Sequence, residues 1–196
     1  LRSKSIKAML AKQLNPEIIF KSENHKMMSY NALTNLNLIY LYFSNKFQDQ
    51  KNNFYYFDYD LDNNLLGFFI PKNILKLDIY NLLMQSTNSQ HALSTSNRKF
   101  YWNSIENYFE PIVYDTNIDI NRSTPTTTTT LFRLPISKQF YEAFEVLEKK
   151  LSNLNLNNIH KNLELSGINL SKADLIMKIN KIIFNLNAIK KAYLNM

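Results

Sequence analysis

Two polar residues on either side of an aromatic stretch are the strongest indication of chemistry in this sequence. Asn97 lies just before the aromatic segment 99–102, and Asp115 directly follows the segment 108–114. Because both segments favour strand structure and flank a polar stretch at 103–107, they predict a β-hairpin. A hairpin places the start of its first strand beside the end of its second, so Asn97 and Asp115 should be neighbours. An amide oxygen beside a carboxylate suits Mg²⁺, which takes few protein ligands together with phosphate and water.

The residues around this hairpin resemble a known family. The matching strings are Asn97-Arg98-Lys99-Phe100-Tyr101, Glu110-Pro111-Ile112 and Tyr114-Asp115, and they are similar to the spore coat protein H (CotH) kinase-like family. The similarity covers about residues 75–120 and extends to the remaining helices only in their order. The resemblance implies an atypical protein-kinase-like fold, ATP and Mg²⁺ as cofactors, and phosphoryl transfer to a protein or small-molecule acceptor.

The resemblance also implies roles for individual residues. In kinases an Asn of the catalytic loop and an Asp beyond a hairpin bind the metal. By this resemblance Asn97 and Asp115 are the metal ligands of the chain, and Asn97, Arg98 and Lys99 are the residues that contact the nucleotide. The glycine-poor amino-terminal lobe with its nucleotide-contacting lysine is expected upstream, outside this sequence.

The chain departs from the family at the catalytic base. The family has an Asp about five residues before the Asn, but this chain has Ala92 there, preceded by His91. A histidine can accept a proton near neutral pH, which makes His91 the candidate base. The alternative is a catalytically degenerate site that binds nucleotide without efficient transfer.

The surrounding elements predict an α+β fold that is mainly helical with two short β-hairpins, resembling the C-terminal lobe of the kinase-like fold. Apolar residues at helical spacing predict helices over 4–14, 29–47, 72–84, 137–151 and 171–193. The segments 54–59 and 65–70 flank turn residues and predict the other hairpin. The Ser171/Asp174 pair resembles a capping box at the start of the last helix.

The domain organisation predicted from the sequence is one domain over residues 1–196. A Thr-rich segment at about 121–131 predicts a flexible loop within this domain. The first residue, Leu1, is neither an initiator Met nor part of an apolar leader, so we expect the chain to be a piece of a longer protein.

Composition excludes several classes of function. The chain has 196 residues, no cysteine and two glycines. The lack of cysteine excludes a disulfide scaffold, a thiolate metal site and a cysteine nucleophile. The scarcity of glycine excludes a Walker loop and a dinucleotide fingerprint, both of which need clustered glycines. No stretch reaches the roughly 18 apolar residues of a membrane-spanning helix.

The charge of the chain admits a second hypothesis. There are 23 Lys+Arg against 16 Asp+Glu, which gives a net charge of +7, and 13% of the residues are aromatic. Lysines interleaved with aromatic residues are typical of single-strand binding, so the alternative is a basic, non-catalytic RNA-binding or assembly module. Against it, the lysines are spread along the chain, and abundant Asn, Ile and Lys are typical of an AT-rich genome. The composition indicates no particular compartment.

Overall fold

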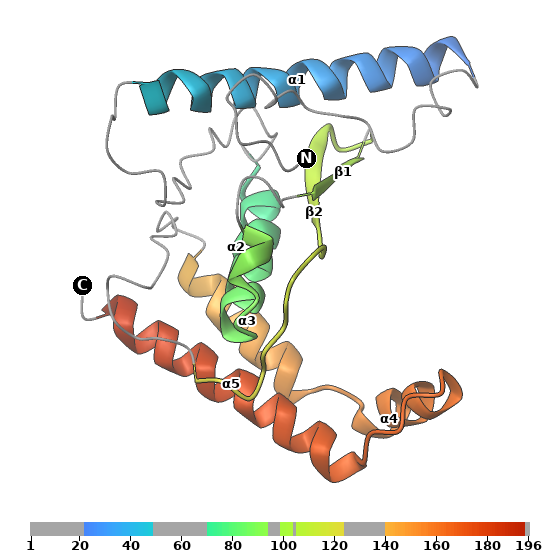
Figure 1. Cartoon of the computed structure of the whole chain (residues 1–196), viewed down its shortest axis with the longest axis vertical. Coiled ribbons are helices and arrows are strands. Elements are labelled where there is room, and N and C mark those ends of the chain that lie inside the picture. Colours follow the sequence, from blue (N-terminus) through green and yellow to red (C-terminus); the bar gives the residue numbers. More distant parts are fainter. Residues whose placement is uncertain (1–21, 49–69, 94–98, 104, 124–139, 195–196) are drawn as a thin grey trace. The chain divides into compact units, whose positions relative to one another are not determined.

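A computed structural model describes residues 22–48, 70–93, 99–103, 105–123 and 140–194, with the side chains of 39–48 excepted. The elements of this described part are α1 (Glu23–Gln48), α2 (Pro71–Ser86), the 3-10 helix η3 (Gln90–Leu93), β1 (Lys99–Asn103), β2 (Tyr108–Ile112), α3 (Phe140–Ser152), α4 (Leu156–Leu165) and α5 (Lys172–Leu194) (Figure 1). The predominance of helix with one antiparallel hairpin confirms the predicted α+β class. The predicted helix over 4–14, residues 54–69 of the predicted hairpin over 54–70 and residues 124–131 of the Thr-rich segment lie outside the described residues.

The chain divides into two compact units. The first contains residues 1–74 and 94–114, and the second contains residues 75–93 and 115–196. The prediction of one domain over the whole sequence stays a prediction. Within the described part of the chain, no helix combines the length and the apolar character that crossing a bilayer requires.

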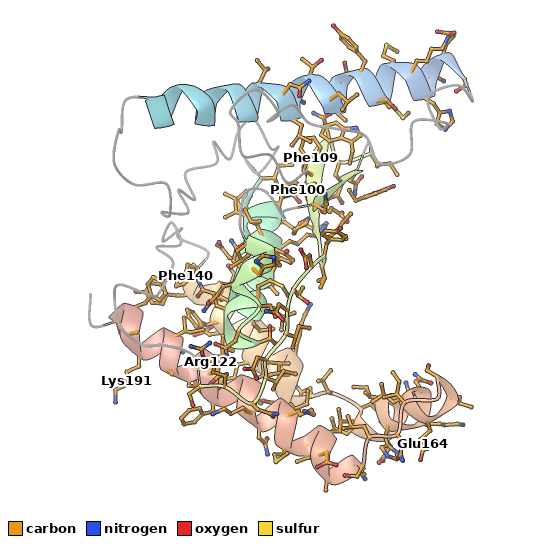
Figure 2. All side chains as sticks on the ribbon, in the orientation of Figure 1. Phe100, Phe109, Arg122, Phe140, Glu164 and Lys191 are labelled. Atoms are coloured by element: carbon orange, nitrogen blue, oxygen red, sulfur yellow. The ribbon has the colours of Figure 1, made fainter. Side chains whose placement is uncertain are left out.

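The hairpin that the sequence predicts over these segments forms in the first unit. The pairing runs without interruption from Lys99 opposite Ile112 to Asn103 opposite Tyr108, so β2 ends before the predicted residue 114. One face is aromatic, because the Phe109 ring packs against Trp102 at a centroid distance of 4.7 Å and against Phe100 at 5.8 Å (Figure 2). These ring pairs add to the stability that burial alone gives the hairpin.

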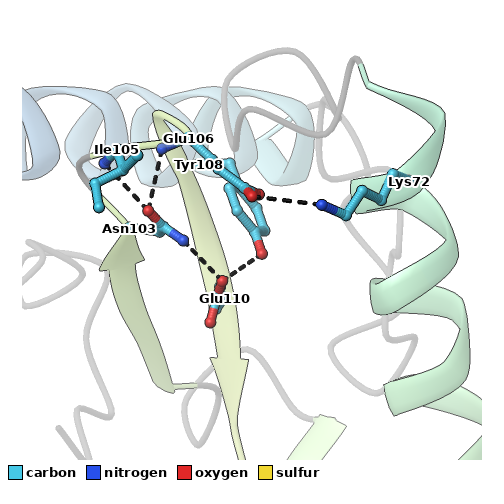
Figure 3. A network of polar contacts seen from close by, with 6 residues as sticks. All are labelled: Lys72, Asn103, Ile105, Glu106, Tyr108 and Glu110. Atoms are coloured by element: carbon cyan, nitrogen blue, oxygen red, sulfur yellow. Dashed lines mark hydrogen bonds and ion pairs between the residues drawn. The ribbon is translucent and has the colours of Figure 1, made fainter.

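The other face of the hairpin is polar and organised by one asparagine (Figure 3). The Asn103 Oδ1 accepts hydrogen bonds from the backbone N–H groups of Ile105 and Glu106, both at 3.1 Å, which fixes the connecting turn. Its Nδ2 donates to Glu110 Oε1 at 2.9 Å, and the buried Tyr108 hydroxyl donates to the same oxygen. The turn and both strands therefore share one hydrogen-bond network.

Two further features complete the turn. Asn107 adopts a left-handed conformation with φ of 54°, which asparagine tolerates better than most residues. The Glu106 carboxylate lies 3.5 Å from the Lys72 ammonium, and both side chains are partly exposed. Exposed pairs of this kind contribute at most about 1 kcal/mol, so the hairpin depends mainly on its backbone pairing and aromatic face.

The core of the second unit forms where α3 packs against α5. Phe140 is fully buried and meets Phe144 at a ring distance of 5.0 Å and Tyr193 at 4.9 Å. The side of α5 that faces inward carries the buried residues Leu175, Ile182, Asn185, Leu186, Ile189 and Tyr193. Four of the apolar positions match the stripe that the sequence predicts for this helix, whereas Ile179 and Ile183 are only half-buried.

Helix α4 is an element that the sequence analysis did not predict. It spans Leu156–Leu165 and has no buried residue, so its apolar stripe is shallow. Its start is fixed by Asn155, whose Oδ1 accepts the backbone N–H of Asn158 at 3.0 Å, an N-cap that the sequence contains. This cap, together with Leu156, Ile159 and Leu163 at helical spacing, was a signal from which the helix could have been predicted.

The connection from α4 to α5 contains one motif that ends α4 and one that begins α5. Gly167 has a φ of +75°, and its N–H bonds to Glu164 O while Ile168 N–H bonds to Leu163 O, which is a Schellman motif. Ser171 Oγ then accepts the N–H of Asp174 at 3.0 Å and donates to its carboxylate at 2.6 Å. The predicted cap is confirmed, although the shorter Asp bonds the hydroxyl where Glu would reach the backbone.

Candidate functional site

His91 and Asp115 lie against each other in the second unit. The His91 Nε2 is 3.3 Å from Asp115 Oδ2, and each side chain is 50% exposed. The sequence analysis selected both residues, one as base and the other as metal ligand, but it did not predict their contact. A carboxylate that touches an exposed imidazole is an arrangement that can orient the ring.

His91 projects outward because its neighbours are held inward. It belongs to η3, in which Ala92 and Leu93 are buried. The Ala92 N–H bonds to Ser89 O at 3.0 Å, and Ser89 Oγ lies 2.8 Å from Thr87 Oγ1 in a buried hydroxyl pair. These bonds fix the short helix and leave the imidazole on its exposed side.

The burial of Ala92 clarifies the departure from the CotH pattern. Position 92, where the resemblance places the catalytic Asp, is fully buried in this chain. An Asp at that position would bury a carboxylate, which is unfavourable without a partner. The side chain that reaches Asp115 is that of His91.

Asp115 opens a segment that is tied to the end of α2. Its φ of 47° is left-handed, a conformation that aspartate tolerates. Farther along the segment, Asp119 N–H bonds to Thr87 O at 3.2 Å. The Asn88 Nδ2 donates to Asp119 O at 3.1 Å and to Arg122 O at 2.7 Å. The backbone that follows Asp115 is therefore held on the same turn that precedes η3.

A buried amide of α5 completes this attachment. Asn185 is fully buried, and its Nδ2 donates to Ser86 O at 2.9 Å and to Arg122 O at 3.1 Å. Figure 2 shows Arg122 beside α5. The sequence analysis missed Asn185, although a polar residue next to Leu186 on the apolar stripe of α5 was a usable signal. One side chain thus joins the end of α2, the 115–123 segment and α5.

The other predicted site residues are not part of the contacts described for His91 and Asp115. Asn97 and Arg98 lie outside the described residues, so the expected meeting of Asn97 with Asp115 stays a prediction. Lys99 begins β1 in the first unit, and its Nζ lies 4.9 Å from the centroid of the Tyr114 ring. A cation over an exposed ring is stabilised by about 0.5–1 kcal/mol. The predicted phosphate contact of Lys99 is untested.

One of the two predicted metal ligands, Asp115, lies in the described part of the chain. Its carboxylate is an oxygen donor of the kind that Mg²⁺ takes, and Mg²⁺ needs few protein ligands when water and phosphate supply the others. Among the residues that the structure describes, no group of three or more His, Cys, Asp or Glu side chains gathers.

Comparison with known proteins does not assign the chain to a family. A scan against protein-family models finds no match, and searches of curated proteins and of solved structures find no significant match. The resemblance to the CotH kinase-like family therefore stays a prediction from the residues that carry it.

Proposed function

We propose that this chain binds ATP with Mg²⁺ at Asp115 and transfers the γ-phosphoryl group to a protein or small-molecule acceptor, in the manner of a CotH-like atypical kinase. The observation that carries the proposal is the 3.3 Å contact between His91 Nε2 and Asp115 Oδ2 on the exposed side of η3. It joins the candidate base to the candidate metal ligand.

Each residue has a distinct task in this proposal. The Asp115 carboxylate has two oxygens, and with Oδ2 directed at His91 the other is the expected metal ligand. Mg²⁺, when bound, neutralises the charge on the phosphate oxygens. His91 takes the proton of the acceptor hydroxyl on a ring nitrogen. The acceptor oxygen then forms its bond to the γ-phosphorus while the bond from that phosphorus to the β–γ bridging oxygen breaks, and ADP leaves.

The packing around the pair supports such a task, because catalytic groups must be held in place before the reaction. His91 is fixed by the buried residues beside it in η3, and the segment after Asp115 is fixed by Asn88 and Asn185. Both side chains are therefore mounted on restrained backbone, although each remains accessible to a ligand.

The first test is nucleotide binding. We expect the full chain to bind a fluorescent ATP analogue only when Mg²⁺ is present, and the Asp115→Asn variant to bind it about 10- to 150-fold more weakly, the range for loss of a charged partner. Asp119→Asn is the matched control, because it removes the same charge from an exposed residue of the same segment. Equal affinity in the wild type and Asp115→Asn would rule out the metal-site assignment.

The second test separates catalysis from binding. We expect His91→Ala to lower the rate of ADP formation while the affinity for the Mg²⁺–nucleotide complex stays near that of the wild type. His160→Ala is the control, since His160 also faces a carboxylate, that of Glu164 at 3.7 Å, but on α4. An unchanged rate in His91→Ala would remove His91 from the mechanism. Nucleotide binding without ADP formation in the wild type would establish the degenerate alternative and contradict the transfer step.

A further inference from the structure

The side of α5 that faces away from its core carries five exposed residues and one half-buried lysine, Lys181. We define the α5 outer face as Met177, Asn180, Lys181, Phe184, Asn187 and Lys191. Five of these six recur at alternating steps of three and four residues and therefore lie along one line of the helix. At 1.5 Å per residue this line is about 21 Å long.

A large exposed aromatic ring lies at the middle of this face. Phe184 is 60% exposed, although its neighbours Asn185 and Leu186 are buried on the opposite side of α5. The helix therefore does not need Phe184 for its own packing. An aromatic ring left in water on a well-packed helix is a typical contact residue, because its planar surface can stack on a partner.

A lysine is fixed against this ring. The Lys181 Nζ lies 4.8 Å from the centroid of Phe184 and donates a hydrogen bond to Ser123 Oγ at 2.8 Å. Ordering a lysine side chain costs conformational entropy. Because Lys181 is already ordered by these two contacts, a partner that binds it does not have to order it. A positive charge is thus already positioned beside the exposed ring.

The charge of the helix beyond its first turn is entirely positive. Residues 175–194 contain lysines at 178, 181, 190 and 191 and no Asp or Glu. The nearest acid within the helix, Asp174, bonds the Ser171 hydroxyl at the N-terminus. Figure 2 shows Lys191 pointing away from the packed helices. The α5 outer face therefore offers positive charge to an anionic partner.

The residue types on the α5 outer face favour one class of partner over a second helix or a membrane surface. A second helix would require apolar residues along the line, but Asn180, Asn187 and Lys191 interrupt it. A membrane surface would likewise require a continuous apolar side. Amides on either side of an aromatic ring instead match nucleobases, which stack on rings and offer hydrogen-bonding edges, and lysines match the phosphates.

We propose that the α5 outer face binds single-stranded nucleic acid, with a base stacked on Phe184 and phosphates paired with Lys181 and Lys191. This surface shares no residue with the His91–Asp115 pair. The proposal therefore does not depend on whether that pair binds ATP. It gives a role to two of the lysines of α5, Lys181 and Lys191.

The test is fluorescence anisotropy of the full chain with a labelled oligouridylate. Loss of a base–aromatic stack should weaken binding about 5- to 150-fold in Phe184→Ala. Phe184→Leu should lose as much, because it keeps apolar volume but has no ring face, whereas Phe184→Tyr should retain binding. Between about 50 and 200 mM salt, Lys191→Gln should lower the salt dependence by about 0.7 per lost phosphate contact, while Lys149→Gln on α3 should not.

Several outcomes would overturn the proposal. One is the absence of oligouridylate binding at low salt. Another is equal affinity in Phe184→Leu and Phe184→Tyr, which would mean that the ring does not stack on a base. Equal affinity for a duplex of the same charge would also contradict it, because paired bases cannot stack on Phe184. Preferential binding to phosphatidylserine vesicles would assign the face to a membrane surface instead.

Discussion

Replacing Phe140 with alanine should lower the free energy of unfolding by about 3–5 kcal/mol, the range measured when a buried aromatic ring is removed from a core. Phe140 is fully buried, and it contacts Phe144 on its own helix and Tyr193 on α5. The loss combines the apolar burial of the ring, its contacts with the other two rings and the cavity left between the helices. Urea denaturation followed by circular dichroism measures this change.

The control for this prediction is another phenylalanine of the same unit. Phe184→Ala removes the same side chain from an exposed position on α5, so its effect should stay within about 0.5 kcal/mol. If the two variants were equally stable, Phe140 would not lie in the core between α3 and α5. The same control also establishes that Phe184→Ala is folded when its binding is measured.

Replacing Asn185 with leucine should lower the free energy of unfolding by about 2–4 kcal/mol, because buried carbonyl groups lose their donor. Leucine has a similar branched shape but a larger volume, so no cavity forms, and the loss combines the missing hydrogen bonds with some overpacking. Ser86 O loses the donor at 2.9 Å, whereas Arg122 O keeps the bond from Asn88. Asn187→Leu, two residues along the same helix but exposed, should change stability by less than about 0.5 kcal/mol.

A double-mutant cycle sharpens this result. Asn88 and Asn185 donate to the same oxygen, Arg122 O, so their effects should not add. Asn88→Gly is the suitable partner variant, since glycine keeps the left-handed φ of 54° while removing the amide. A coupling of about 0.5–3 kcal/mol is expected between residues of one hydrogen-bond network. Strict additivity of the two changes would contradict the shared acceptor.

Much of the secondary structure could be predicted because it depends on local patterns. Helices α2, α3 and α5 each carry their own apolar period, and the aromatic segments with a polar turn were sufficient for β1 and β2. Helix α4 was missed although Leu156, Ile159 and Leu163 recur at helical spacing, because a helix of ten residues carries only a few such positions. The predicted hairpin over 54–70 lies, but for Ile70, outside the described residues.

The contacts of the candidate site were harder to predict, because they depend on backbone geometry that the pattern does not encode. The His91–Asp115 contact requires a 3-10 turn that directs residue 91 outward and a left-handed residue at 115. The partners of Asn185 are backbone carbonyls far away in the sequence, at residues 86 and 122. A residue type can suggest that a buried amide needs acceptors, but only the folded chain identifies them.

The chemistry of the amide network has an evolutionary consequence. Asn88 and Asn185 donate only to main-chain oxygens in these bonds, those of residues 86, 119 and 122. Every amino acid supplies such an oxygen, so these bonds leave the acceptor positions able to change side chain over time. The two donors have no such freedom, since few residues combine an amide with the required size. Descendants of a common ancestor should therefore preserve this pair of asparagines while the side chains between them diverge.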